Sequence, residues 1–411
     1  MDGKLLRNYA RLIARSGINV IKGQEVIIRT EPEQTDFVEL LAEECYLAGA
    51  GKVTADWRFL PLTRLDIQYQ SPETLGGVEK WQEERLRHNA ETLPAMIYLD
   101  SDDPDGLDGT DQEKWAAAQQ ARYKITRPYR DAMENKYQWC VAAVPGKKWA
   151  KKVFPALSGH EAEEKLWELI LRCSRADGPD PLAAWEEHNR NLSRRCRWLN
   201  ELRLKKLIYK SESTGTDFQV GLMPQMLFCG GEEALPGKGV MFNANIPSEE
   251  VFTTPMRGEA EGIVYATMPL SYQGVLIESF SLRFEKGRVV EARAEKNEEA
   301  LKQMISMDEG AGMLGECALV PWESPIRESG VLFYNTLFDE NASCHLALGA
   351  GYSSCLADCW KYSPEEARAL GVNDSMIHED FMIGAPDLSI RGVTEGGGEV
   401  AIFEQGRWAR D

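Results

Sequence analysis

The first half of the chain alternates between strand-like and helix-like patterns of hydrophobic and polar residues. Residues 25–30, Glu-Val-Ile-Ile-Arg-Thr, form a short β-rich run after a glycine. Residues 34–48 then place one set of apolar side chains on a single helical face: Phe37, Leu40, Leu41, Cys45 and Ala48. Glycines at 49 and 51 end this helix, and residues 52–57 predict a second strand.

The same rhythm continues to about residue 175. Apolar runs at 95–99 and 139–144 predict two more strands, and helical patterns cover roughly 114–136 and 161–175. Strands that alternate with helices in this way form parallel sheets covered by helices. We therefore expect residues 1–200 to form an N-terminal α/β domain with a mostly parallel sheet.

A long polar helix over about 181–202 precedes a change of pattern. Residues 206–210 and 217–221 flank Ser-Thr-Gly-Thr, which predicts a β-hairpin. A second hairpin is predicted for residues 276–284 and 288–294, around Glu-Lys-Gly.

Two helices are expected within this second half, over about 297–307 and from a capping box at 363–366 that has Pro at the first helical position. We therefore predict a C-terminal β-rich α+β domain over residues 201–411, with the domain boundary near residue 200.

Composition indicates an ordinary globular protein. The chain has 411 residues, 43% of them hydrophobic and 27% charged, which is long enough for two domains. Its net charge of -18 argues against nucleic acid as a partner, because phosphate binding needs clustered Lys and Arg. An acidic protein suits cationic ligands or metals, although solubility explains the charge equally well.

Cysteine usage and hydropathy indicate a cytoplasmic protein. The nine cysteines lack framework spacing, which fits free thiols in a reducing compartment. No apolar run approaches the roughly 20 residues that span a bilayer, so we expect no membrane association. The N-terminal segment reads as an amphipathic helix and not as a signal peptide.

The usual local motifs of hydrolases and nucleotide-binding proteins are missing. The chain contains no HExxH, no GxxxxGK[ST] and no GxSxG. Residues 100–106 superficially resemble a calcium loop, but they lack its closing Glu and its register, so a solvated turn is the better reading.

The segment Ile-His-Glu-Asp-Phe contains the best local candidates for metal ligands. In an extended chain His378 and Asp380 point to the same face, so an imidazole and a carboxylate can converge on one ion. The apolar Phe-Met-Ile-Gly that follows places this pair at the mouth of a buried strand. Taken alone, a His-x-Asp is common and is usually not a metal site.

A second candidate segment runs from Glu340 to Tyr352. His345 lies in an apolar, glycine-bounded stretch, where a satisfied core histidine is the usual reading. Tyr352 follows Gly-Ala-Gly, and its phenol could reach the same cleft and steady an oxyanion there, although a core or surface tyrosine is the default.

Two further acids lie next to apolar runs. Glu250 stands beside Glu249, and a strand would point one of them at solvent and the other at a site. Glu316 lies in Gly-Glu-Cys-Ala-Leu-Val, where a buried carboxylate needs a partner, either a metal or a Lys or Arg. The combined set of four acids and two imidazoles suits two divalent ions that share a carboxylate, so a hydrolytic metalloenzyme is the first hypothesis.

Several segments together resemble the M29 family of metalloaminopeptidases from about residue 8 to the C-terminus. They are RNYARLIARSGINVIKGQEVIIRT, NIPSEEVFTTP, LGECALV, TLFDENASCHLALGAGY, NDSMIHEDFMIG and GEVAIFEQGRWA. The resemblance implies an α/β N-terminal domain, a β-rich C-terminal domain, a homodimer and a two-metal centre that removes N-terminal residues from peptides.

The resemblance also implies roles for individual residues. Five match the family's metal ligands: Glu250, Glu316, His345, His378 and Asp380. Tyr352 matches its active-site tyrosine, and Glu340 falls in its Asp-Glu-Asn segment as a further ligand. Glu379 stands where the family usually has an aliphatic residue, and we expect it to face away from the metals.

The expected chemistry is hydrolysis of the N-terminal peptide bond by a water that two divalent ions (Zn, Co, Mn or Mg) activate. Glu316 would bridge the ions, and Tyr352 would stabilise the tetrahedral species. Glu250, or another acid that is free of full coordination, would carry a proton to the leaving amine, and the sequence does not decide which acid is the base. The alternatives are a dinuclear hydrolase of another amide or ester, and a non-catalytic metal-binding protein.

Overall fold

The computed structural model describes residues 1–235, 237–272 and 274–410. The chain divides into two compact units. The first unit comprises Met1–Glu187 and Glu232–Pro247, and the second comprises His188–Gly231 and Ser248–Asp411. The predicted domain boundary near residue 200 stays a prediction.

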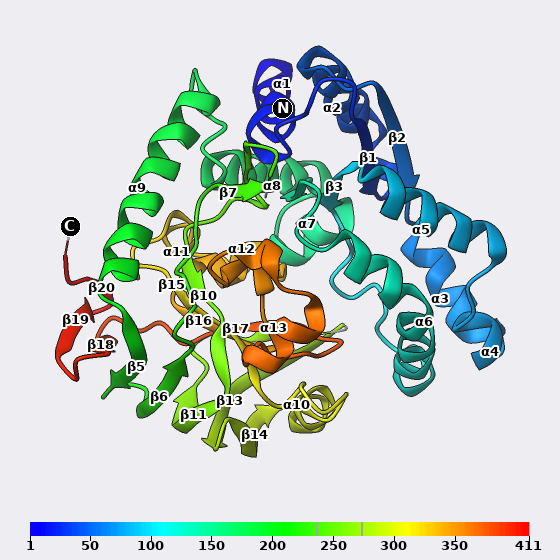
Figure 1. Ribbon diagram of the computed structural model, residues 1–411. Helices are drawn as coiled ribbons and strands as arrows, with labels where there is room; N and C mark the ends of the chain where they lie inside the picture. The colour runs from blue at the N-terminus through cyan, green and yellow to red at the C-terminus, as the bar shows by residue number, and fades with distance from the viewer. Residues whose placement is uncertain (236, 273, 411) are drawn as a thin grey trace. The chain divides into compact units, whose positions relative to one another are not determined.

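The first unit contains a parallel sheet with the strand order β2-β1-β3-β4-β9 in the described part of the chain (Figure 1). Its strands are β1 (Glu25–Thr30), β2 (Lys52–Trp57), β3 (Ala95–Asp100), β4 (Trp139–Ala143) and β9 (Asn245–Ile246). Every pair is parallel, with β1 between β2 and β3. The predicted parallel α/β sheet is therefore confirmed, and its last strand comes from a segment beyond residue 200.

Helices precede the first of these strands and follow most of them, as the alternating pattern predicts. They are α1 (Gly3–Leu12), α2 (Thr35–Ala48), α3 (Leu60–Tyr69), α4 (Pro72–Leu75), α5 (Lys80–Thr92), α6 (Gln112–Met133), α7 (Lys147–Val153) and α8 (Gly159–Cys173), and α9 (Pro181–Glu201) comes next. Gly49 ends α2 at φ 115, a left-handed conformation that glycine adopts without strain.

The second unit is built on a large antiparallel sheet. Its described strands follow the order β12-β13-β11-β6-β5-β18-β19-β20, with β14 beside β13. They are β5 (Leu204–Ser211), β6 (Thr216–Leu222), β11 (Pro255–Tyr265), β12 (Leu270–Tyr272), β13 (Val275–Glu285), β14 (Arg288–Lys296), β18 (Ser389–Thr394), β19 (Glu399–Glu404) and β20 (Arg407–Trp408). Both predicted hairpins, β5–β6 and β13–β14, are confirmed.

A second antiparallel sheet, which we call the small sheet, has the order β10-β15-β16-β17. Its strands are β10 (Val251–Thr253), β15 (Leu314–Leu319), β16 (His345–Gly349) and β17 (His378–Met382). One face of it shares a hydrophobic core with the large sheet, in which Leu346 and Phe381 join Phe218 and Phe284. The rings of Phe280 and Phe381 are 5.6 Å apart between centroids across this core.

The remaining elements are short. They are the hairpin β7 (Glu233–Leu235) and β8 (Val240–Phe242), and the helices α10 (Glu298–Ile305), α11 (Pro325–Glu328), α12 (Thr336–Asp339) and α13 (Pro364–Leu370). The predicted capping box is present, because Ser363 and Glu366 each bond the other's backbone N–H. Among the described residues, no helix is both long and apolar enough to cross a membrane.

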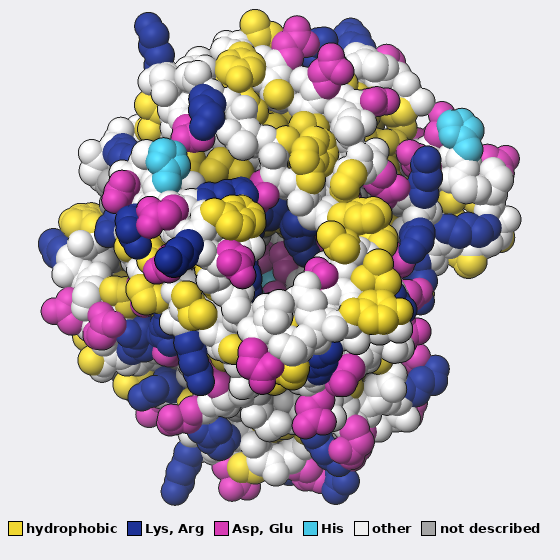
Figure 2. Space-filling view, turned by 90° about the vertical axis from the view of Figure 1, so that its right-hand side faces the viewer, with side chains coloured by type: hydrophobic (Ala, Val, Ile, Leu, Met, Phe, Trp, Pro, Cys, Tyr) yellow, Lys and Arg dark blue, Asp and Glu magenta, His cyan; other side chains and the backbone are white. Residues whose placement is uncertain are grey.

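All nine cysteines are free. Figure 2 shows acidic and basic side chains interspersed over the face in view, with hydrophobic side chains between them. On this face the acidic side chains alternate with basic ones and do not form one acidic field.

Candidate metal centre

The register of the small sheet brings the predicted ligands onto its face away from the hydrophobic core. Residues paired across antiparallel strands point to the same side. Glu316 pairs with Ala347, and Ala347 pairs with Asp380, so the two acids flank an alanine. His345 lies on the same face two residues before Ala347, and His378 lies two residues before Asp380.

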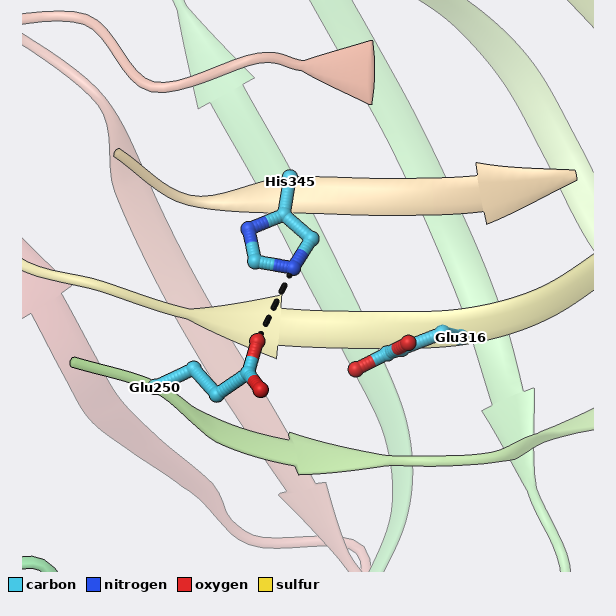
Figure 3. Close-up of side chains that lie close together, drawn as sticks. All are labelled: Glu250, Glu316 and His345. Carbon is cyan, nitrogen blue, oxygen red and sulfur yellow. Dashed lines mark ion pairs between the residues drawn. The ribbon is translucent and has the colours of Figure 1, made fainter. Parts of the chain in front are cut away.

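Glu250, Glu316 and His345 form the first group of potential ligands, which we call the His345 group. Figure 3 shows the three side chains pointing toward one another, with Glu250 just before β10 and the other two on β15 and β16. His345 Nε2 lies 3.1 Å from Glu250 Oε2. All three side chains are buried.

Glu316, His378 and Asp380 form the second group, which we call the His378 group. His378 Nε2 lies 3.1 Å from Glu316 Oε2 and 3.5 Å from Asp380 Oδ2. In each group the ligand atoms lie within 4.8 Å of one another, and Glu316 belongs to both. Two groups of three donors that share one carboxylate match the arrangement expected for a pair of ions.

Two atoms of this cluster fit a metal because they are buried without a hydrogen bond. Among the described residues, neither His345 Nε2 nor Asp380 Oδ1 makes a hydrogen bond. The close contacts of His345 Nε2, with Glu250 Oε2 at 3.1 Å and with Asp380 Oδ1 at 3.9 Å, are ion-pair contacts. Leaving buried polar atoms unpaired costs free energy, so such atoms need another partner. Imidazole nitrogen and carboxylate oxygen are common ligands of zinc, manganese and cobalt in proteins.

The other nitrogen of each histidine is held by a backbone carbonyl. His345 Nδ1 lies 3.2 Å from Ser343 O, and His378 Nδ1 lies 2.7 Å from Ala350 O. A carbonyl accepts only from a protonated nitrogen, which leaves Nε2 available as a ligand atom in the neutral imidazole. Both rings are therefore oriented with Nε2 toward the acids.

Burial and the nearby negative charges raise the pKa values of two acids in the cluster. Burial, and then the nearby Glu250 and Asp380, raise the pKa of Glu316 to about 7. Burial and the same acids raise the pKa of Glu340 well above its usual range. Carboxylates this close repel one another in a dry site, and a bound cation relieves that repulsion.

The same negative charges raise the pKa values of His345 and Tyr352. Burial disfavours a charged imidazole, but the adjacent Glu250 carboxylate outweighs this and raises the pKa of His345 to about 9. Tyr352 OH lies 3.1 Å from His378 Nε2, and its ring stands edge-on to Phe252. Burial, and next the charge of Glu316, raise the pKa of Tyr352 well above 10.0, so the phenol stays protonated.

Glu340 lies at the edge of the cluster. It begins a short 3-10 turn, Glu340–Ala342, and is 9% exposed. Asn341 Nδ2 donates to Glu340 Oε1, and Asn341 Oδ1 accepts from Glu249 N. Asn341 therefore connects two acid-bearing segments, a role that the sequence analysis missed because an amide does not titrate.

One local expectation is wrong. Glu249 does not face solvent, because it is 8% exposed, and β10 begins only at Val251, so the strand alternation assumed for Glu249 and Glu250 does not apply. Of the remaining histidines, His88 and His160 have exposed side chains. His188 is half-buried, with Nε2 2.7 Å from Ser248 O.

Comparisons with known proteins agree on one family. The model of the thermophilic metalloprotease family (M29) matches residues 2–408. Aminopeptidase AmpS of Bacillus subtilis is 40% identical over 98% of this chain and 98% of its own length. Aminopeptidase T of Thermus thermophilus is 40% identical over the same shares.

A solved structure gives the same result for the fold. Wild-type AmpT from Thermus thermophilus superposes with a TM-score of 0.88 at 38% identity and covers 99% of both chains. Sequence and structure therefore agree with the resemblance that the motifs carry. The chain belongs to the thermophilic metalloprotease family M29 and is a hydrolase that acts on peptides.

Proposed function

We propose that this protein is a metal-dependent aminopeptidase that hydrolyses the N-terminal bond of peptides at a centre for two divalent ions. The observation that carries the proposal is the pair of ligand groups that share Glu316. The relatives Aminopeptidase AmpS and Aminopeptidase T are aminopeptidases, which supports the substrate class.

The proposed ligands of one ion are Glu250, Glu316 and His345, and those of the other are Glu316, His378 and Asp380. Glu340 is a further ligand in this proposal, since Asp380 and Glu250 are close enough to shift its pKa. Divalent ions bound there would lower the pKa of a water molecule and polarise the scissile carbonyl.

The side chains around the ions supply the remaining steps. Glu250 accepts a proton from the attacking water and passes it to the leaving amine. Tyr352 keeps its proton and donates a hydrogen bond to the oxyanion of the tetrahedral species. The surplus of carboxylates holds the free α-ammonium of the substrate, which explains cleavage from the N-terminus.

Loss of activity on metal removal is the first test of this proposal. Dialysis against a chelator should abolish hydrolysis of an aminoacyl-p-nitroanilide, and Zn, Co, Mn or Mg should restore it. The matched N-acetylated substrate should not be cleaved, because it lacks the ammonium group. Full activity in a metal-stripped sample would contradict the proposal.

Glu316→Gln tests the shared carboxylate. The substitution keeps the shape of the side chain and removes its charge, so activity should fall by at least about 1,000-fold while the thermal unfolding transition remains. Retained metal content with cleavage of acetylated amides or esters would favour the alternative hydrolase. Bound metal without turnover of any peptide would favour a binding protein.

We also propose that the protein is a homodimer. Several large apolar side chains of α3 and its flank are exposed in the first unit: Phe59 (54%), Leu62 (52%), Leu65 (50%) and Tyr69 (76%). Leu62, Leu65 and Tyr69 follow helical spacing along one face of α3. Contiguous apolar faces of this kind mark association surfaces.

A further inference from the structure

One carboxylate, that of Asp308, ties together two loops of the second unit. Asp308 Oδ1 accepts from the N–H groups of Gly310 and Ala311, both at 2.9 Å. Asp308 Oδ2 accepts from Met376 N at 2.6 Å, and the Ser375 hydroxyl lies within 3.0 Å of both oxygens. The loop that precedes β15 and the loop that precedes β17 thus share one charged acceptor.

Asn373 also connects these loops through hydrogen bonds. It is 2% exposed, and its Nδ2 donates to Gly310 O at 2.9 Å and to Gly349 O at 2.6 Å. Its backbone carbonyl accepts from Gly351 N. Asn373 therefore connects the loop before β15, the end of β16 and the loop before β17.

These ties lead directly to His378. Ile377 N donates to the Ser375 hydroxyl, and Ile377 O accepts from Ala350 N. Ala350 O in turn lies 2.7 Å from His378 Nδ1. The position of the imidazole is thus set by the same loop that Asp308 and Asn373 hold.

The backbones in this region are too close to shift independently. A Cβ on Gly310 would lie 2.0 Å from Asp374 O, and a Cβ on Gly349 would lie 2.1 Å from Ile377 O. The loop before β17 therefore packs against both neighbours without space for a side chain. Losing one of its hydrogen-bond anchors should move His378 and not merely soften an exposed loop.

We propose that Asp308 and Asn373 are positioning residues that set His378 and Asp380 for ion binding by the His378 group. The inference rests on the two-ion centre proposed above. It adds a selectivity. Asp308 bonds Ser375 and Met376, which come directly before Ile377 and His378. Its contacts with Gly310 and Ala311 lie farther along the chain from Glu316, the ligand that both groups share. Loss of the hydrogen bonds of Asp308 should therefore weaken ion binding by the His378 group and spare ion binding by the His345 group.

The test is titration of Co²⁺ into the metal-free full-length protein, followed by visible absorption and by equilibrium dialysis. His378→Ala and His345→Ala first assign the two binding steps to their groups. Asp308→Asn should then weaken the step assigned to the His378 group by about 10- to 100-fold, as loss of outer-shell partners does. The other step should change by less than about 3-fold.

Asp387→Asn is the matched control. Asp387 is also a carboxylate that accepts from two serine hydroxyls and a backbone N–H, those of Ser211 and Ser213. None of these partners is a proposed ligand. This variant should leave both Co²⁺ steps unchanged, which separates positioning of the ligands from the general loss of a carboxylate that holds several hydrogen bonds.

Ser375→Ala keeps the inference testable if Asp308→Asn does not fold. It removes one donor to Asp308 and the acceptor of Ile377 N, and it should weaken the same step by a smaller factor. Equal weakening of both steps, or of neither, would overturn the positioning role. Wild-type protein that binds fewer than two Co²⁺ ions would overturn the two-ion centre itself, and the inference would fall with it.

Discussion

Tyr352 is the proposed catalytic side chain that stands outside both groups of ligands. Its hydroxyl lies 3.1 Å from His378 Nε2, and Phe252 supports its ring. Tyr352→Phe removes only the donor, so kcat should fall by about 100-fold, as loss of one oxyanion donor does. The KM and the bound metal should stay near the wild-type values, and steady-state kinetics with metal analysis measures all three.

Tyr209→Phe is the control for this prediction. Tyr209 is fully buried in the shared core behind the small sheet, and the change deletes the same phenol oxygen there. Its kcat should match the wild type. An unchanged kcat in Tyr352→Phe would contradict a role for the phenol in the reaction.

At the residue scale, sequence patterns reveal titratable ligands better than they reveal the residues that position those ligands. His378 and Asp380 stand out because an imidazole and a carboxylate two positions apart share a face of a strand. Asn341 and Asp308 do not stand out, because their partners lie 92 and 67 positions away for the contacts with Glu249 and Ser375. Such pairings depend on the fold and carry no local pattern.

Ala347 is important at the scale of the strand. It lies between Glu316 and Asp380 across β15, β16 and β17 and is fully buried. Ala347→Val would place two methyl groups between the acids, so Co²⁺ affinity should fall by more than about 10-fold and the unfolding free energy by roughly 1–3 kcal/mol. Dialysis and denaturant titration measure these two effects.

Leu346→Ile tests the opposite face of the same strand. Leu346 points into the core shared with the large sheet, and a swap of equal volume should cost less than about 1.5 kcal/mol. Ion binding should be retained. If both variants lose ion binding equally, the effect of Ala347→Val does not arise from the space between the acids.

The loop after β17 predicts a pH effect on stability. Burial opposes the charge of Asp387, but the hydrogen bonds from Ser213 and Ser211 outweigh it and lower the pKa from 3.8 to about 2. Asp387 therefore contributes stability above pH 3.8 that is lost as the pH falls toward 2. Since the group is partly solvated, this contribution is about 1 kcal/mol.

Urea unfolding between pH 2 and pH 5 measures that contribution, on the order of 1 kcal/mol. Asp387→Asn should show a shallower loss of stability with acid than the wild type, while the two proteins keep the same slope against urea. Parallel pH profiles for the two proteins would mean that the serine contacts do not stabilise the carboxylate.

Elements with strong periodicity were predictable, and the small sheet was not. The hairpins β5–β6 and β13–β14 are local, so turn residues and alternation reveal them. Strands β15, β16 and β17 are joined by long segments that contain the short helices α11, α12 and α13. No turn or alternation near any one of these strands therefore indicates its partner. The resemblance to a known family pointed to the ligand residues on these strands but not to the pairing of the strands.

At the scale of the whole molecule, the proposed dimer depends on the exposed face of α3. Leu65→Glu places a charge on that face, where Leu65 is 50% exposed, and should shift the full-length protein toward monomer in light scattering coupled to size-exclusion chromatography. Val290→Glu is the control, since Val290 is 52% exposed on β14 in the second unit. Dimer retained in the first variant, or lost in both, would rule out α3 as the interface.

Composition and charge indicated a globular protein that does not bind nucleic acid, but they did not indicate which reaction it catalyses. The net charge of -18 is compatible with cation binding and with solubility alone. The convergence of Glu250, just before β10, with Glu316 on β15 and His345 on β16 favours cation binding (Figure 3). The fold class followed from the alternation of patterns, and the candidate site followed from the family resemblance together with the tertiary structure.

The return of the chain to the parallel sheet has a practical consequence for dissecting the protein. Strand β9 (Asn245–Ile246) pairs with β4 and belongs to the first unit, although it lies beyond residue 200. A fragment truncated at residue 200 would lack β9 and leave the outer edge of β4 with unpaired N–H and C=O groups. Such open edges recruit other strands, so this fragment should self-associate when it is expressed alone.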